Sequence, residues 1–382
     1  MTSSACKRPR IRRIDRAGTA IAALLVAATP ACKQDVACED QPGWVCAVAG
    51  TGELGFNRDG APARDCDFFL PSAARRGPDD RVYIMDFNNQ RLRVLEDDDT
   101  VDTVIGSGFH AVATTDIPAT TTPLENPIDF SWDSQGRLVF VSYHDPRVLR
   151  LAPDGTLHAI AGADDGVVGV DGNEGDGGPA LEALFIQPDG IAIAPDDTIY
   201  VSDSLANRVR VIRDGMIDTV AGNGEMTFSG DGGPGIEAAL HWPSAIELDA
   251  EGNLFIAETR NHVVRRLAVD GTITTYAGTG GLPGSVGDGG PATDALLDQP
   301  YGLAFDDAGN LYVADRGNFR VRRISPDGTI DAFAGTGFEG TSGDGGPADR
   351  AQFGYMARLS FDDDSLLVAD QSNSVIRRIM LP

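Results

Sequence analysis

Carboxylates recur in this sequence at intervals that could gather several of them around one centre. A strand–turn–strand motif occurs six times, 55 to 60 residues apart, and its first strand ends at Asp86, Tyr143, Asp203, Glu258, Asp315 and Asp370. Each copy has an arginine on its second strand, at Arg93, Arg150, Arg210, Arg265, Arg322 and Arg377. A six-fold cation-binding ring is one reading, but one ligand does not need the same carboxylate in every copy. We expect these carboxylates to cap backbone N–H groups at the turns and to pair with the arginines.

Residues at which the copies differ are better candidates for binding. The second copy has Tyr143-His144-Asp145-Pro146 where its siblings have an Asp-x-x-Asn turn, and the fourth and fifth copies bring His241, Trp242 and Tyr301 to the start of a strand. We predict that Tyr143, His144, His241, Trp242, Tyr301 and Asp189 contribute to a ligand site. Because His241 stands alone, the alternative interpretation is that it is a surface residue that binds no ligand.

The third copy contains a candidate calcium site. The segment that leads into it is about five residues longer than its equivalents and includes Asp171, Asn173 and Asp176, with Asp164 and Asp165 just before them. Carboxylate and amide oxygens are the ligands that Ca²⁺ prefers, although the spacing is not that of an EF-hand. A solvated acidic loop is the alternative.

Motifs typical of enzymes are rare in the chain. It has neither a G-x-S-x-G elbow nor a phosphate-binding GK[ST] loop, and its five histidines (110, 144, 158, 241 and 262) do not occupy matching positions in the copies. A calcium-dependent lactonase would need Asn, Asp and Glu side chains that converge, for which Asn126, Asp129, Asp189 and Glu247 are candidates. Catalysis is therefore left open, without residues assigned to it.

The elements that position these residues are short strands. Apolar residues alternate within runs of four to six, separated by turn sequences such as Pro-Asp-Gly, and a second marker of the GDGGPA type lies between successive copies. Four strands per copy make a blade that cannot bury both of its faces alone, so the blades must stack radially and close. The sequence thus predicts an all-β, six-bladed β-propeller.

The two ends of the propeller are expected to close the ring together. The last copy has no fourth strand, and residues 44–52 match the fourth strands of the other copies, so they should complete the sixth blade. The Asp/Glu turns, the GDGGPA segments and the starts of the inner strands at Pro71, Pro127, Pro188, Pro243 and Pro300 are expected to converge on one rim. The candidate ligand residues would then lie near the mouth of a central channel.

These motifs resemble NHL repeats, particularly the teneurin-type repeats with GDGGPA between blades, over residues 44–382. The resemblance implies the propeller fold. It says less about activity, because NHL propellers include protein-binding scaffolds, sensor domains and enzymes such as amidating lyases.

The N-terminal segment and the net charge indicate where the protein is located and which partners are not expected. A basic leader and an apolar run over residues 17–28, too short to span a bilayer, predict a signal peptide at 1–31, a short linker at 32–43 and the propeller at 44–382. Cys32 follows the cleavage site, so a lipid anchor and simple secretion are both open. With 57 acidic against 31 basic residues and a net charge of −26, nucleic acid is not an expected partner.

Export would permit disulfides. Cys46 falls on the polar side of the closing strand, where an exposed thiol is best explained by a bridge to Cys38 or to Cys66.

The sequence therefore predicts an exported, monomeric binding scaffold in the bacterial periplasm or outside the cell. Its partner would be a protein, or a small-molecule or carbohydrate ligand, on the rim of the propeller. A metal-dependent lactonase or lyase, with calcium at the channel mouth, is the alternative from another class. A third interpretation is a component of a larger surface assembly whose partner docks on the divergent second blade.

Overall fold

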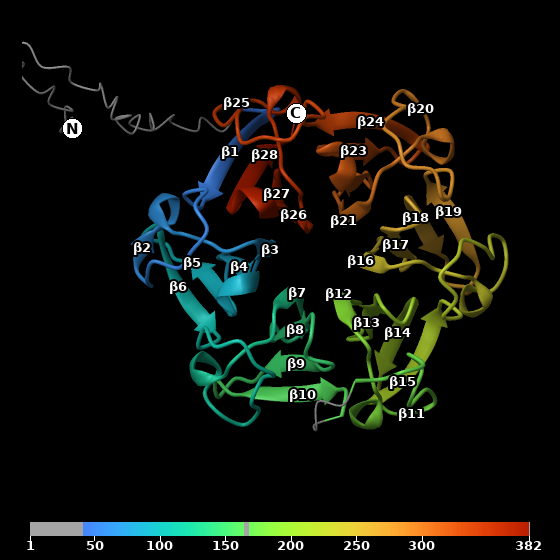
Figure 1. Cartoon of the computed structure of the whole chain (residues 1–382), viewed down its shortest axis with the longest axis horizontal. Helices are drawn as coiled ribbons and strands as arrows, with labels where there is room; N and C mark the ends of the chain where they lie inside the picture. Colours follow the sequence, from blue (N-terminus) through green and yellow to red (C-terminus); the bar gives the residue numbers. More distant parts are fainter. Residues whose placement is uncertain (1–40, 164–167, 382) are drawn as a thin grey trace, which may run out of the picture. The chain divides into compact units, whose positions relative to one another are not determined.

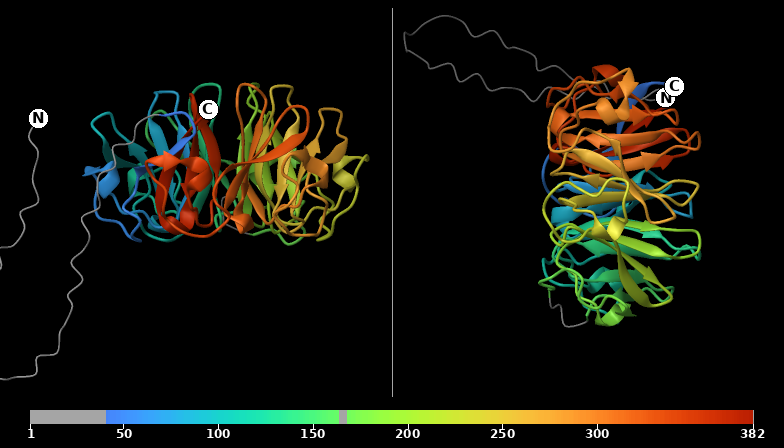
Figure 2. Two further views of the ribbon diagram at one scale, coloured as in Figure 1. Left: turned by 90° about the horizontal axis from the view of Figure 1, so that it is seen from above. Right: turned by 90° about the vertical axis from the view of Figure 1, so that its right-hand side faces the viewer.

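The computed structural model describes residues 41–163 and 168–381, so the predicted signal peptide and Cys32 lie outside the described residues. Six antiparallel sheets make up the described part, and each is one blade of a β-propeller (Figure 1). Viewed edge-on, the blades lie side by side in a single layer (Figure 2). No helix among the described residues is both long and apolar enough to cross a membrane.

The inner strands surround the channel, and each contacts the next blade around the ring. They are β3 (Pro71–Arg76), β7 (Pro127–Trp132), β12 (Pro188–Ile193), β16 (Pro243–Leu248), β21 (Pro300–Phe305) and β26 (Leu359–Asp362). Five of the six begin at the predicted prolines.

Two middle strands and an outer strand complete each blade. The second strands are β4 (Val82–Asp86), β8 (Leu138–Ser142), β13 (Ile199–Asp203), β17 (Leu254–Glu258), β22 (Leu311–Asp315) and β27 (Ser365–Asp370). The third strands are β5 (Arg91–Leu95), β9 (Val148–Leu151), β14 (Arg208–Arg213), β18 (Val263–Leu267), β23 (Arg320–Ile324) and β28 (Val375–Met380). The outer strands are β6 (Thr100–Ile105), β10 (Leu157–Ala161), β15 (Met216–Ala221), β19 (Ile273–Ala277), β24 (Thr329–Ala334) and β1 (Trp44–Ala49).

The predicted closure is confirmed. Strand β1 pairs antiparallel with β28, with Val45 opposite Ile379 and Cys46 opposite Arg378. The first strand of the propeller is thus the outer strand of the last blade, which leaves no open sheet edge between the ends of the ring.

The GDGGPA-type segments run along the outer edges of the blades. In four blades an Ala-Pro or Gly-Pro dipeptide of these segments forms a short fifth strand on the outer edge, at β2 (Ala61–Pro62), β11 (Gly178–Pro179), β20 (Gly290–Pro291) and β25 (Gly346–Pro347). They follow the circumference in Figure 1, whereas the inner strands begin at the channel.

Alternate side chains of the middle strands pack into opposite blade interfaces. In β22, Leu311 and Val313 join the core between blades four and five, whereas Tyr312 and Ala314 join the core between blades five and six. Six such clusters, one at each interface, bury apolar side chains on both faces of every sheet. This double burial fixes the position of each inner strand at the channel.

Short 3₁₀ turns complete the blades. They are η1 (Ala63–Asp65), η2 (Phe87–Asn89), η3 (Ala119–Thr121), η4 (Ala180–Glu182), η5 (Gly235–Glu237), η6 (Ala292–Asp294), η7 (Arg316–Asn318), η8 (Ala348–Arg350) and η9 (Gln371–Asn373).

Candidate functional site

The repeated carboxylates have the structural role that the repetition predicts. Oδ1 of Asp315 accepts the backbone N–H of Asp298 at 2.7 Å, and its Oδ2 accepts from Asn318 at 2.8 Å and from Arg322 at 3.4 Å. Nη2 of Arg322 lies 2.6 Å from Oδ1 of Asp288 in the GDGGPA segment. The turn, the inner strand and the crossover of a blade are therefore joined through one buried carboxylate and one buried guanidinium.

Burial sets the protonation equilibrium of these carboxylates. It raises the pKa of Asp86 and Glu258 to about 7, and the pKa of Asp203, Asp315 and Asp370 to about 6, while backbone N–H groups and the arginines oppose the rise. They belong to the framework and do not face a ligand.

The second blade departs from the predicted alignment by one residue. Ser142, not Tyr143, lies opposite Pro127, as Asp86 lies opposite Pro71. Arg150 is therefore not the counterpart of the other arginines. Asp145 and Arg147 form the buried pair in this blade, with Nε 2.7 Å from Oδ1. Because β8 ends at Ser142, Tyr143 is the residue that follows the strand, as Phe87 follows Asp86 in the first blade. Its side chain lies at the channel mouth.

A buried ion-pair network closes the middle of the channel. Arg358, which precedes β26, donates from Nε to Asp129 at 3.0 Å and from Nη2 to Asp189 at 2.6 Å. The hydroxyl of Tyr301 lies 3.1 Å from the same oxygen of Asp189, and Arg75 donates to Asp129 at 3.2 Å. Burial raises the pKa of Asp189, and Arg358 opposes the rise. The predicted ligand residue Asp189 is thus held under the mouth, neutralised by a guanidinium.

Above this network lies a cavity of about 410 Å³, which we call the mouth pocket. Five blades contribute its walls, which are Leu70, Phe87, Ile128, Tyr143, Trp242, Thr259, Arg260, Gln299, Tyr301, Arg316, Tyr355 and Gln371. Three of the six predicted ligand residues, Tyr143, Trp242 and Tyr301, are among them. Hollows of about 630 and 840 Å³ lie between blades three and four and between blades four and five, and none of their lining residues lines the mouth pocket.

Two arginines in the mouth pocket lie over aromatic rings. Cζ of Arg316 is 4.7 Å from the ring centroid of Tyr301 and 5.3 Å from that of Tyr355, and Nη2 donates to Gln371 at 3.2 Å. Cζ of Arg260 is 5.6 Å from the ring centroid of Trp242. Within residues 41–163 and 168–381, neither guanidinium has a carboxylate as an ion-pair partner. Arg316 was not predicted from the sequence, because it occupies a turn position that differs between the copies.

Trp242 reaches the pocket because of its backbone. Its φ of 56° is in the left-handed region, and Asn207 of the preceding blade accepts its N–H at 3.0 Å. Gln299 is held in the same way, with a φ of 51° and its N–H donated to Nδ1 of His262 at 3.1 Å. Side chains at the turn of one blade therefore position the pocket residues of the next.

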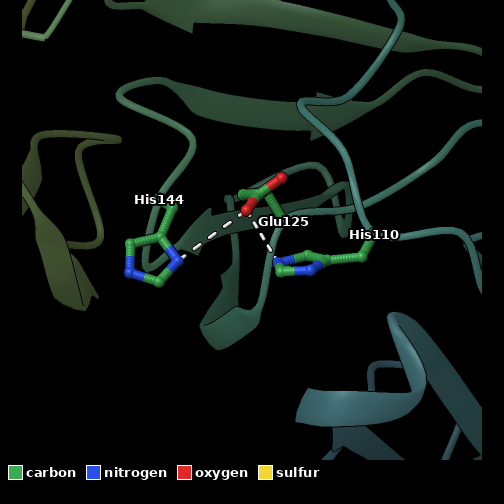
Figure 3. A group of neighbouring side chains, drawn as sticks. All are labelled: His110, Glu125 and His144. Atoms are coloured by element: carbon green, nitrogen blue, oxygen red, sulfur yellow. Dashed lines mark ion pairs between the residues drawn. The ribbon is translucent and has the colours of Figure 1, made fainter.

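His241 and His144 do not line the mouth pocket. His241 donates its backbone N–H to Glu258 at 2.9 Å, and burial together with Arg260 lowers the pKa of its imidazole. His144 instead approaches two residues that the sequence did not single out, His110 and Glu125 (Figure 3). Oε1 of Glu125 lies 2.7 Å from Nε2 of His110 and 3.8 Å from Nδ1 of His144.

Asp176, one of the residues of the predicted calcium loop, makes contacts within its own blade. Asp176 pairs with Arg210 at 2.7 Å and accepts from Thr219 at 2.7 Å, as its equivalents do in other blades. Asp171 and Asn173 are exposed, and residues 164–167 lie outside the described part. The calcium site stays a prediction, and Asp176 is the residue least available for it.

The structure excludes one of the two disulfide pairings that the sequence predicted for Cys46. Cys46 is disulfide-bonded and buried, not exposed as predicted, whereas Cys66 is a free thiol in the core. The pairing with Cys66 is therefore wrong, and Cys38 lies outside the described residues. Burial raises the pKa of the Cys66 thiol to about 11, which keeps it unreactive.

Comparisons with known proteins agree with this architecture. A family model described as NHL repeat matches residues 297–324. Teneurin-m of Drosophila melanogaster is 27% identical over 356 residues, covering 83% of this chain but only 12% of that protein.

Solved structures share the fold at low sequence identity. An auxiliary nutrient binding protein from Bacteroides thetaiotaomicron superimposes with a TM-score of 0.62 at 16% identity, covering 88% of this chain and 75% of that one. A streptogramin B lyase superimposes with a TM-score of 0.51 at 13% identity, covering 85% and 97%. The chain is a six-bladed β-propeller that contains an NHL repeat at residues 297–324 and has distant similarity to teneurins over most of its length.

Proposed function

We propose that the protein binds a small organic anion that carries a ring, and that the mouth pocket is the site. The observation that carries this proposal is the pair of guanidinium groups, Arg316 and Arg260, stacked on aromatic rings in a pocket without acidic lining residues. A guanidinium presents a fork of N–H donors that matches a carboxylate. The lining thus offers a counter-charge and a flat apolar surface together.

The charge of the pocket contrasts with that of the chain. The protein carries a net charge of −26, so cations would be expected to collect on most of its surface. Asp189 lies under the pocket but is paired with Arg358, so it does not cancel the two arginines above it. Local positive charge in an acidic protein favours an anion at this one place.

The aromatic walls favour a ring in the ligand. Trp242, Tyr301 and Tyr355 come from three different blades, and Tyr355 is 40% exposed. Tyr301 is 8% exposed, so Trp242 and Tyr355 are the rings that can stack on an aromatic ligand or on the apolar face of a sugar. Pockets of this kind use a few polar groups to orient the ligand. A ring-bearing carboxylate is the shared chemistry, with acidic sugars and aromatic acids as two sources.

The structural similarity to a nutrient binding protein supports binding as the activity, although the similarity itself is one of fold. A lactonase or lyase with calcium in the channel is the less favoured alternative. It would require open carboxylates, whereas Asp129 and Asp189 are both paired with Arg358.

We retain export to the cell envelope, with or without a lipid anchor at Cys32, as part of the proposal. The disulfide at Cys46 supports it, because disulfides persist in oxidising compartments. Mass measurement of the protein recovered from cells would test both cleavage and lipidation.

The binding proposal is tested by titrating the protein with three groups of compounds: acidic sugars, aromatic carboxylates, and the neutral counterpart of each. Isothermal calorimetry at low and moderate salt gives the affinities. We expect an acid to bind at least about 10-fold more tightly than its neutral counterpart, since a hydrogen bond to a charged group contributes about 1.5–3 kcal/mol.

Variants locate the site. Arg316→Gln and Trp242→Ala should each weaken binding about 10-fold, whereas Arg266→Gln, in a hollow on the outside of the propeller, should not change it. Equal losses for Arg316→Gln and Arg266→Gln, or neutral compounds binding as well as acids, would overturn the proposal.

A further inference from the structure

The second blade carries a group of side chains that neither the framework nor the mouth pocket uses. His110, Glu125 and His144 come from the crossover into the blade, the start of its inner strand and the turn after β8, and they meet at its surface (Figure 3). Their nearest ligating atoms all lie within 4.8 Å of one another. Among the described residues no other set of three His, Cys, Asp or Glu side chains meets this condition.

We propose that His110, Glu125 and His144 bind a divalent first-row transition metal, with Zn²⁺ as the reference ion. Two imidazoles and one carboxylate form a donor set that Zn²⁺ accepts, and their mixture of nitrogen and oxygen distinguishes the site from the all-oxygen sites of Ca²⁺ and Mg²⁺. This site is separate from the predicted calcium loop in the third blade.

The distances fit an ion with small side-chain movements. Zinc bonds to nitrogen and oxygen are about 2.0–2.2 Å long, which places tetrahedral ligand atoms about 3.3–3.5 Å apart. The observed separations from Oε1 of Glu125, 2.7 Å to His110 and 3.8 Å to His144, lie on either side of that value. The two imidazoles are 55% and 54% exposed, so both can adjust, and Glu125 is 19% exposed.

A fourth donor is held in place beside the three. Oδ1 of Asn126 lies 2.9 Å from Nε2 of His110 and 3.2 Å from Nδ1 of His144. The amide is oriented by its other end, because Nδ2 donates to Asn88 at 3.0 Å, and the residue is buried. Asn126 therefore keeps an oxygen directed at both imidazoles whether or not an ion is bound.

Backbone hydrogen bonds prearrange the three segments. The N–H of Ala111 donates to Leu124 O at 3.1 Å, and the N–H of Leu124 donates to Phe109 O at 3.1 Å, so His110 is clamped against the segment that carries Glu125. His144 donates its own N–H to Glu125 O at 3.4 Å. A site assembled before the metal arrives loses little conformational entropy on binding.

The open side of the site faces solvent next to the mouth pocket. The ring of Tyr143 packs edge-on against His144 with centroids 5.2 Å apart and also lines the pocket. None of the three proposed ligands lines the pocket, so the metal site and the anion site can fail or succeed independently.

The test uses the full chain without a histidine tag. Competition with a chromophoric zinc chelator at pH 7.5 gives stoichiometry and affinity, and Co²⁺ in place of Zn²⁺ reports coordination through its visible absorption. We expect one ion per chain, with affinity reduced at least 10-fold in His144→Ala and in Glu125→Gln, and the Co²⁺ band lost in the double variant His110→Ala/His144→Ala.

The matched control is His158→Ala, because His158 is 43% exposed and also pairs with a carboxylate, Asp116 at 2.9 Å, but is not part of the proposed site. It should leave zinc affinity unchanged. Circular dichroism confirms that each variant is folded, which the exposure of both imidazoles leads us to expect. Zinc binding that is equal in the wild type and the double variant, or equally weakened by His158→Ala, would overturn the proposal.

Discussion

Nη2 of Arg358 lies 2.6 Å from Oδ1 of Asp189, although 169 positions separate the two residues in the chain. Both are buried at the centre of the ring, where inner strands of different blades meet. This pair and the neighbouring contact of Arg358 with Asp129 hold the third, second and sixth blades together through charge. The floor of the mouth pocket therefore depends on a correct closure of the propeller.

Replacement of Arg358 by leucine should strongly destabilise the protein. It would remove the guanidinium that pairs with the buried Asp189 and one of the two that contact the buried Asp129, which costs about 3–5 kcal/mol of unfolding free energy. Urea-induced unfolding measures the loss. Arg81→Leu is the control, because Arg81 is 33% exposed and pairs with acids that are 39% and 30% exposed, so it should cost less than about 1 kcal/mol. Equal costs for the two substitutions would contradict the assigned role of Arg358.

A methyl group at Gly302 should also destabilise the ring. A Cβ at this position on β21 would collide with the carbonyl oxygen of Ala357 in the next blade, and we expect a loss of about 1–3 kcal/mol. At Gly346, on the outer edge, the nearest atom to an added Cβ is Gly343 O at 3.4 Å. Gly346→Ala should change stability by no more than about 0.5 kcal/mol. Thermal unfolding of both variants distinguishes a close approach of blades from a general effect of the substitution.

His262 should make part of the stability dependent on its neutral form. Nδ1 accepts the N–H of Gln299, and burial together with Arg260 lowers the pKa of the imidazole, although Asp298 opposes this. Because the pKa of His262 is lowered in the folded protein, its contribution to the unfolding free energy is complete above the ordinary pKa of about 6.5. This contribution is lost as the pH falls through the lowered pKa of the folded protein.

Asparagine tests this role, because Asn207 holds Trp242 in the same way one blade earlier. His262→Asn should keep the hydrogen bond and remove the extra acid sensitivity, while His262→Ala should lose about 1 kcal/mol at neutral pH. The measurement is unfolding free energy between pH 5 and pH 8. An acid sensitivity that persists in His262→Asn would show that the proton binds elsewhere.

The buried carboxylates at the turns should make the protein less stable as the pH rises, which is opposite to the effect of His262. Their pKa values, raised by burial to about 6 in Asp315 and about 7 in Glu258, mean that the stability they contribute is present below about pH 4 and is lost as the pH rises through 6 to 7. We expect the unfolding free energy to fall by about 2 kcal/mol or more between pH 5 and pH 8.

Salt separates this effect from repulsion among surface charges. At 0.5 M NaCl exposed charges are largely screened, whereas the buried groups are not, so the fall should persist. Stability that rises from pH 5 to pH 8 at high salt would show that these groups remain ionised in the folded protein.

The fold could be predicted because its signal is local and repeated. Alternating apolar residues, turn glycines and two markers in phase recur in each copy, and each copy reports the same four strands independently. The closure by residues 44–52 followed from the missing fourth strand of the last copy, and β1 (Trp44–Ala49) occupies that place. The framework role of the repeated carboxylates followed from repetition itself.

The sites depend on contacts that the sequence does not encode locally. Trp242 and Tyr301 were predicted at the mouth from their place at inner-strand starts, but Arg316 was not, because a turn arginine looks the same whether it faces solvent or an aromatic ring.

The register of the second blade shows the same limit. Sequence similarity alone placed the end of the first strand at Tyr143, whereas β8 ends at Ser142, and Tyr143 lines the pocket instead. His110 and His144 are 34 residues apart and belong to different loops, so only the packing of the crossover against the blade brings them to Glu125. The sequence by itself determined the blades and their order, since these arise from local periodicity. Tertiary structure alone decided which side chains meet at the channel and at the rim, because side chains from different blades come together only when the ring closes.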